Sequence, residues 1–371
     1  MTLVLRTFLI LGLFIFCKSA LAIDAKLKIG VVLPRTGAMS PIGEELQRGI
    51  TVAFNRIKSN PKSRIAKNLQ IVFVDDKGTS EGAIKATEEL ILRHRVHAII
   101  GSVSNSINDT ISDIVASRQK TMVLPIASRE ILAKSKNFFS VATDFETQGK
   151  NLGTFASSRI KSNKIFIIVR KDEPEERLLA DAFSKGYKAR SGKSPETLEV
   201  ESFESVDASI ARRMQNAAVF IPASISESAP LLQRFEGKSS PKIIGSELWE
   251  TAVPPNAIVD GGLEVYYHAP YSIGSPHSAL QAFVSSFKDA YNKQPSSIAF
   301  AGYESFNTIV YAYTRVKSNR TSPIVQYLKS AKKLPSLSGP ASIGPSRFSR
   351  KPISVETFTK SGPKYVTKIG P

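Results

Sequence analysis

The chain carries few residues of the kinds that perform covalent chemistry. It has one cysteine, Cys17, and four histidines, His94, His97, His268 and His277. A histidine serves as a general base or metal ligand when carboxylates or further ligands surround it, and none of the four stands in a motif with such spacing. The sequence also lacks a Gly-x-Ser-x-Gly elbow, His-Glu-x-x-His, a Walker loop and a Rossmann glycine fingerprint. This pattern disfavours catalysis, and we expect neither a metal nor a cofactor.

The N-terminal segment has the features of a signal peptide. Arg6 precedes an almost wholly apolar run at residues 7–17, and the segment closes with Ala20-Leu21-Ala22, a small-x-small cleavage pattern. We predict that residues 1–22 are removed after Ala22 and that the protein is periplasmic. The apolar run is short for a membrane span, although an N-terminal anchor helix is the alternative interpretation. Cleavage would remove Cys17, which leaves the mature chain without disulfides or thiolate sites.

The charge of the chain is strongly positive. Among 371 residues, 50 are Lys or Arg and 32 are Asp or Glu, so the formal net charge is +18, and loss of Arg6 and Lys18 would leave +16. The basic residues are scattered singly, with no run of five and no helix-turn-helix, zinc-finger or RNA-binding signature. We therefore interpret the charge as a solvated surface and do not expect nucleic acid as a partner. Long-range attraction of an anionic ligand is the alternative.

The length of the chain favours two domains, and the pattern of apolar residues indicates their class. Buried strands are predicted at residues 28–33, 69–74, 98–100 and 121–125, alternating with helices at 44–58, 79–95 and 106–117. The alternation then restarts, with helices at 148–160, 176–189 and 229–235 and strands at 164–169, 217–221, 242–244 and 263–267. Three helices, at 278–291, 299–316 and 323–330, precede terminal strands at 354–358 and 365–368. Such βαβα alternation predicts parallel sheets with helices on both faces.

Short motifs occur in and between these predicted elements, in a fixed order. They are Thr36-Gly37, Asp75-Asp76, Ile100-Gly101, Leu124-Pro125-Ile126-Ala127-Ser128, Thr143-Asp144 with Gln148-Gly149, Gly245-Ser246-Glu247, Gly261-Gly262-Leu263 and Gly302-Tyr303-Glu304. In this order and spacing, the chain resembles the periplasmic branched-chain amino-acid-binding proteins, the type I solute-binding proteins of ABC transporters. The resemblance covers residues from about 26 to 366.

The resemblance implies an α/β fold of two doubly wound parallel-sheet lobes joined by three crossovers, near Thr143, Tyr267 and Leu337. The first lobe would take residues 24–143 and 270–337, and the second would take 144–269 and 338–371. The ligand would lie at the carboxyl ends of the strands, between the lobes, and lobe closure would bury it.

The resemblance also implies a set of ligand contacts in the first lobe. A ligand carboxylate would meet Asn105, with Ser106 beside it, and Ser128, while Ile126 would offer backbone groups. The loop at residues 104–106 opens a predicted helix, where free N–H groups and the helix dipole favour an anion. A plain helix N-cap is the alternative for this loop. Arg129 would either pair with a further ligand anion or be solvated.

In the second lobe, the acidic residue that meets the ligand ammonium falls on Glu247; the alternative is a surface-loop glutamate. Trp249 would either flank the ligand or pack in the core. Ile42, Glu175 and Ser224 stand where relatives carry aromatic residues around the ligand. These departures weaken a specific prediction of leucine or isoleucine, and Glu175 would suit a cationic or polyhydroxylated ligand.

Together these observations predict a binding protein. The leading hypothesis is capture of a small polar, amino-acid-like ligand between the lobes, followed by delivery to an ABC transporter permease at the inner membrane. The alternative is a ligand-sensing receptor on the same fold that is not coupled to transport. We expect a monomer, and an enzyme is the third and weakest hypothesis.

Overall fold

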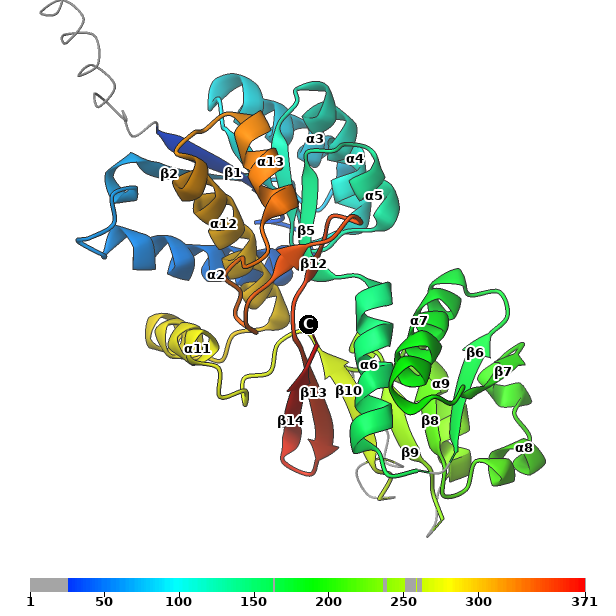
Figure 1. Cartoon of the computed structure of the whole chain (residues 1–371). Coiled ribbons are helices and arrows are strands. Elements are labelled where there is room, and N and C mark those ends of the chain that lie inside the picture. Colours follow the sequence, from blue (N-terminus) through cyan, green and yellow to red (C-terminus); the bar gives the residue numbers. More distant parts are fainter. Residues whose placement is uncertain (1–25, 163, 236–238, 251–257, 259–261, 371) are drawn as a thin grey trace, which may run out of the picture.

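The computed structural model describes residues 26–162, 164–235, 239–250, 258 and 262–370. The predicted signal peptide, residues 1–22, lies outside the described residues. Two seven-stranded sheets, each sandwiched between helices, form two separate bodies joined by a narrow waist (Figure 1). None of the helices in the described ranges is both long and apolar enough to cross a membrane.

The first sheet is mostly parallel. Its strand order is β11 (Ser342–Ile343), β12 (Phe348–Arg350), β5 (Phe138–Thr143), β4 (Thr121–Leu124), β3 (Ala98–Ile100), β1 (Leu27–Leu33) and β2 (Leu69–Asp75). β1 to β5 pair in parallel, with Ile29 opposite Ile71 and Ala98, and β12 joins β5 in parallel. Only the two-residue β11 runs antiparallel to its neighbour. The central strands are buried on both faces, which is why they read as continuous apolar runs in the sequence.

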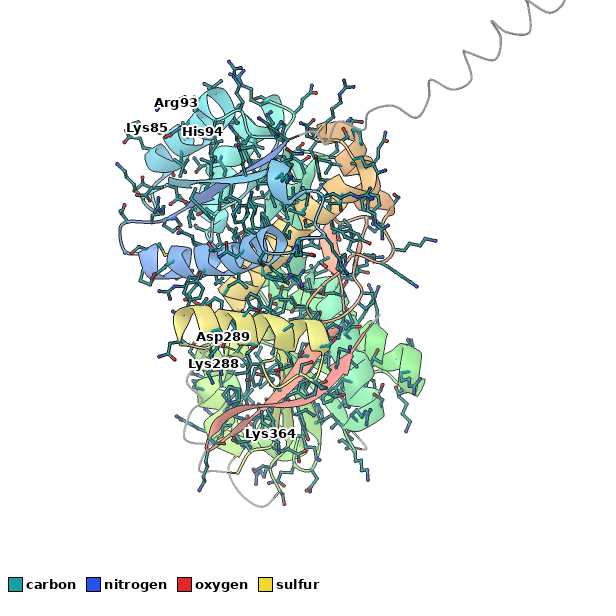
Figure 2. The ribbon with its side chains drawn as sticks, turned by 90° about the vertical axis from the view of Figure 1, so that its left-hand side faces the viewer. Lys85, Arg93, His94, Lys288, Asp289 and Lys364 are labelled. Atoms are coloured by element: carbon teal, nitrogen blue, oxygen red, sulfur yellow. The ribbon has the colours of Figure 1, made fainter. Side chains whose placement is uncertain are left out.

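Helices cover both faces of the first sheet. One face packs against α2 (Ser40–Lys58), α11 (Ser278–Tyr291), α12 (Ser297–Val316) and α13 (Thr321–Ser330). α2 and α11 lie side by side in Figure 2. The other face packs against α3 (Ser80–Glu88), the π-helical turn η2 (Glu89–Arg93), α4 (Asn105–Ser117) and α5 (Arg129–Ala133). α2 and α12 approach closely, since a Cβ at Gly49 would lie 1.9 Å from the Ala299 carbonyl oxygen.

The second sheet repeats the design. Its order is β14 (Gly362–Ile369), β13 (Ile353–Thr359), β10 (Val265–Ala269), β9 (Lys242–Gly245), β8 (Ala218–Ile221), β6 (Ile165–Arg170) and β7 (Glu196–Val200). The last five strands of this order are parallel, and the hairpin β13–β14 is antiparallel. One face packs against α6 (Phe145–Arg159) and α7 (Pro174–Ser191). The other packs against α8 (Ala208–Arg213), α9 (Ile225–Leu232) and the 3-10 turns η3 (Phe203–Ser205), η4 (Gln233–Phe235) and η5 (Glu247–Trp249). A further turn, η1 (Ala66–Asn68), precedes β2.

We call the first sheet with its helices the first lobe, and the second sheet with its helices the second lobe. The predicted fold class, two doubly wound α/β lobes, is confirmed. One boundary is wrong. Residues 338–371 were expected in the second lobe, with a crossover near Leu337, but β11 and β12 extend the first sheet. The chain crosses between the lobes after Thr143, after Ala269, and at Lys351, between β12 and β13.

A buried ion pair lies at the waist between the lobes. Lys351 is 2% exposed, and its Nζ donates to Glu304 Oε2 at 2.6 Å and to the Tyr271 hydroxyl at 2.7 Å. The Tyr271 hydroxyl donates to the same Glu304 oxygen at 2.7 Å, and Glu304 Oε1 accepts from the Leu337 N–H at 2.7 Å. We call Tyr271, Glu304 and Lys351 the hinge triad. It joins the second and third crossovers to α12.

The hinge triad should be sensitive to the loss of either charge, because a buried ion without its partner retains the full cost of desolvation. We expect Lys351→Met to lower the free energy of unfolding by about 3–5 kcal/mol. The double variant Lys351→Met/Glu304→Gln should lose less than the sum of the two single variants. Urea unfolding measures each value, and Lys360→Met, at an exposed turn, is the control. A loss below about 1 kcal/mol for Lys351→Met, the range of an exposed pair, would contradict the assignment.

Candidate functional site

A cleft of about 470 Å³ lies between the lobes. Its lining residues follow the carboxyl ends of four strands: Asn105 after β3, Ser128 after β4, Asp144 after β5 and Glu247 after β9. Open parallel sheets bind ligands at this edge, because the loops that leave neighbouring strands converge there. The volume lies within the range of small-molecule pockets.

The first lobe offers hydrogen-bond donors to the cleft. Asn105 is exposed in the first turn of α4, a 13-residue helix whose N-terminal N–H groups favour an anion. Ser128 caps α5 by accepting from the Ile131 N–H at 3.4 Å. The Glu130 backbone N–H and the Ser128 hydroxyl hold the pKa of the Glu130 carboxyl below its usual value. Arg129 is exposed and forms no ion pair with any residue in the described ranges.

The second lobe offers carboxylates to the same cleft. Glu247 begins the turn η5, and its side chain is 29% exposed. Burial raises the pKa of Glu247 to about 7, against the opposing effects of a hydrogen bond with Gln148 and the positive charge of Lys351. Glu175 is exposed in the first turn of α7. Its neighbours Glu173 and Glu176 both contact Arg170, whereas Glu175 has no cationic partner in the described part of the chain.

Apolar side chains complete the lining of the cleft. Phe348 and Ile126 come from the first lobe, and Phe145, Leu178 and Leu248 come from the second. Leu248 is 52% exposed, although it stands between the partly buried Glu247 and the fully buried Trp249. An apolar surface beside separated charges suits a ligand with a hydrocarbon portion and polar ends.

The structure brings five of the eight predicted site residues into one cavity: Asn105, Ile126, Ser128, Glu175 and Glu247. The other three lie outside it. Ser106 lines a smaller hollow of about 170 Å³ in the first lobe. Ser224 forms a capping box with Glu227 at the start of α9, and Ile42 is exposed in the first turn of α2. Contacts of these three residues with a ligand stay predictions.

Trp249 packs in the core of the second lobe. Its side chain has no exposed surface, its Nε1 donates to the Ala223 carbonyl at 2.7 Å, and its ring packs against Gly245. Of the two interpretations drawn from the sequence, the structure supports packing. The indole fixes the turn that carries Glu247, because the residue two positions later is held inside the lobe.

Sequence reasoning missed the polar residues beneath Glu247. Gln148 and His268 are both fully buried, with His268 Nδ1 3.2 Å from Gln148 Oε1 and 3.7 Å from Glu247 Oε2. Burial, with a smaller effect of the Lys351 charge, lowers the pKa of His268 to about 3, so the imidazole is neutral and does not form an ion pair with Glu247. Gln148 belongs to a recognised motif, but its partner became apparent only from the fold. In the described ranges, no group of three or more His, Cys, Asp and Glu side chains is arranged to hold a metal.

Comparison with known proteins establishes the family. The family model described as periplasmic binding protein matches residues 26–351. The chain belongs to this family. Leu/Ile/Val-binding protein homolog 3 of Brucella melitensis is 25% identical over 168 residues, which cover 44% of each chain. The match therefore spans less than half the length of this curated relative.

Solved structures show the same fold. An ABC transporter substrate-binding protein from Desulfitobacterium hafniense, in complex with Leu, has a TM-score of 0.71 at 15% identity, covering 92% of this chain and 100% of that one. A solute-binding protein of an ABC transporter from Rhodopseudomonas palustris, in complex with 3,4-dihydroxybenzoic acid, has a TM-score of 0.65 at 19% identity, covering 94% and 97%. These likenesses show that the two-lobed fold accommodates chemically different ligands.

The buried His268 should make the stability of this binding protein sensitive to acid. Between pH 6.5 and about 3 the unfolded chain binds a proton on this histidine and the folded chain does not, so stability falls as the pH falls. Relative to His268→Asn, the wild type should lose about 1.4 kcal/mol per pH unit below 6.5 and nothing above it. Urea unfolding from pH 4.5 to 8 measures the difference, with His277→Asn as a histidine variant outside the cleft. A difference that does not change with pH would contradict a neutral buried His268.

Proposed function

We propose that this periplasmic binding protein captures a small zwitterion, an amino acid or a close relative, between its lobes and delivers it to an ABC transporter permease. The observation that carries the proposal is Glu247, a carboxylate at the cleft surface with no cation of its own within ion-pair distance among the described residues. A ligand ammonium is the partner that such a carboxylate lacks. The donors of Asn105 and Arg129 then lie on the opposite lobe for the ligand carboxylate.

The placement of Glu247 on one lobe and of the Asn105 and Arg129 donors on the other supports capture by closure. A zwitterion that bridges the two lobes satisfies Glu247 on one side and the first-lobe donors on the other. Each contact strengthens when closure excludes water, so ligand binding favours the closed arrangement. The apolar side chains of Ile126, Leu178 and Leu248 would accompany the hydrocarbon part of the ligand.

The ligands of related proteins and the N-terminal sequence support a ligand class and a location. The Brucella relative is named for Leu, Ile and Val, and the Desulfitobacterium protein was solved with Leu, so a branched-chain amino acid is the first ligand to test. We infer that residues 1–22 direct export, that cleavage follows Ala22, and that the mature protein acts in the periplasm as a monomer. The permease at the inner membrane would then receive the loaded, closed form.

Removing the Glu247 carboxylate should strongly weaken the binding of ligands that carry an ammonium. We expect Glu247→Ala to weaken affinity by about 30-fold or more, the effect of deleting one partner of a desolvated charged pair. A thermal-shift screen of amino acids, amides, polyamines and aromatic acids identifies the ligand, and calorimetry gives its Kd. Glu88→Ala, at an exposed helical position, is the control. Unchanged affinity in Glu247→Ala would remove this residue from the site, and a screen without any response would overturn the amino-acid proposal.

The pH dependence of binding distinguishes two ligand classes. The pKa of Glu247 is about 7 without ligand, and an ammonium binds the ionised form, so affinity for an amino acid should fall about tenfold per pH unit below 7 and level off above it. A carboxylic acid without an ammonium would accept a hydrogen bond from protonated Glu247, and its affinity should fall as the pH rises. Titration of leucine and 3,4-dihydroxybenzoate between pH 5.5 and 8 measures both slopes. A flat profile for leucine would contradict the assigned role of Glu247.

A further inference from the structure

The hydrogen-bond partners of the Gln148 amide permit only one orientation of its oxygen and nitrogen. Gln148 is fully buried, and its Nε2 donates to the Thr143 carbonyl oxygen at 2.9 Å. A carbonyl only accepts hydrogen bonds, so the NH₂ side of the amide must face Thr143 and the amide oxygen must face His268. His268 Nδ1 lies 3.2 Å from that oxygen and must therefore carry the imidazole proton.

The protonation state of His268 agrees with this arrangement. The ring has no exposed surface, and Nε2 has no hydrogen-bond partner among the residues that the structure describes. An unprotonated Nε2 fits this buried environment better than a protonated one, because a buried N–H donor without an acceptor retains its desolvation cost. The neutral Nδ1–H tautomer is thus the form that fits both ring nitrogens.

Glu247 lies next to this pair, with its Oε2 3.7 Å from His268 Nδ1. The second N–H of the Gln148 amide can be donated toward that carboxylate, and interaction with Gln148 opposes the rise in the pKa of Glu247. We propose that Gln148 and His268 form a neutral dyad that orients the Glu247 carboxylate toward the ligand ammonium. This inference rests on the proposed function and deepens it by naming the positioning residues of its central contact. A neutral donor holds the carboxylate in place without cancelling its charge, which a lysine or arginine at this position would do.

The dyad also attaches Glu247 to the waist of the molecule. Thr143 is the last residue of β5, where the chain leaves the first lobe, and His268 is the penultimate residue of β10, just before the chain returns. The amide of Gln148 contacts both segments, so the orientation of Glu247 depends on the same backbone that must rotate when the lobes close.

Other charged groups also affect the titration of Glu247. Lys351 stabilises the ionised form from the third crossover, and Glu250 interacts with Glu247 from the end of the same turn. The charged residues that line the cleft with Glu247 are Arg129, Glu130, Asp144 and Glu175. The dyad differs from all of these because it acts through a hydrogen bond and carries no charge.

Three variants test the dyad. Gln148→Met keeps the size of the side chain and removes the N–H donors, and His268→Leu removes the proton that orients the amide. His268→Asn offers an amide N–H close to the position of Nδ1 and should rescue the arrangement. Loss of the donor to the carboxylate should move the midpoint of the affinity–pH profile upward. A midpoint shift of one unit lowers affinity about tenfold at pH 6 and changes it little at pH 8.5. His277→Leu, a histidine variant outside the cleft, is the control.

A purely structural role would give a different result, since lost packing lowers affinity equally at every pH and leaves the midpoint unchanged. An unchanged midpoint of the affinity–pH profile in Gln148→Met overturns the proposal. A midpoint shift in His268→Asn equal to the shift in His268→Leu also overturns it. A second measurement needs no ligand. The pH dependence of the unfolding free energy, compared between each variant and the same variant with Glu247→Gln, reports the titration of Glu247. If no amino acid binds, the proposed function fails while this measurement still decides the dyad.

Discussion

The arrangement of the two lobes depends on a lysine that is almost completely removed from water. Lys351 lies in the third crossover, and its ammonium is held by Glu304 from α12 and by Tyr271 just after the second crossover. A buried ammonium is tolerated only with such partners, so the two crossovers keep fixed positions relative to the helix. α12 is in turn pressed against α2, where Gly49 and Gly302 permit close approach of the backbones. The hinge triad therefore ties two crossovers to the closely packed helices α2 and α12 of the first lobe.

The same charge reaches the ligand cleft. Lys351 lowers the pKa of Glu247 and, as a secondary effect after burial, that of His268. On the other side of the waist, the Ser297 hydroxyl of α12 donates to Glu250, whose pKa burial raises to about 8. Burial thus raises the pKa values of two carboxylates, Glu247 and Glu250, toward neutrality next to the crossover segments. The charge of Lys351 therefore acts both within the hinge triad and on Glu247 in the cleft.

The sequence predicted the fold better than the site, for identifiable reasons. Strands such as β1 and β6 are buried on both faces, so their continuous apolar runs are easily recognised in the sequence. The edge strand β7 has mostly exposed side chains and was not predicted. β12 has three residues in a stretch rich in Ser, Pro and Gly, and only its pairing with β5 shows which lobe it joins.

Among the site residues, those directly after a strand reached the cleft, since parallel strands end at one edge of the sheet. Asn105, Ser128 and Glu247 are of this kind. Ser224 also follows a strand, β8, but it forms a capping box with Glu227 at the start of α9 and lies outside the cleft lining. Gln148 and His268 meet across 120 residues of sequence, and no spacing along the chain could indicate that contact.

The surplus of positive charge does not extend into the cleft. Among the described residues, the charged side chains that line it are one arginine, Arg129, and four carboxylates, Glu130, Asp144, Glu175 and Glu247. Basic residues such as Lys85 and Arg93 lie at the end of the first lobe farther from the second lobe (Figure 2). At physiological ionic strength the Debye length is about 8 Å, so these distant charges are screened from a ligand in the cleft. A site built to attract anions would carry the opposite local balance. The local charges therefore favour a ligand with at least one cationic group, and the net charge of the chain is a property of its outer surface.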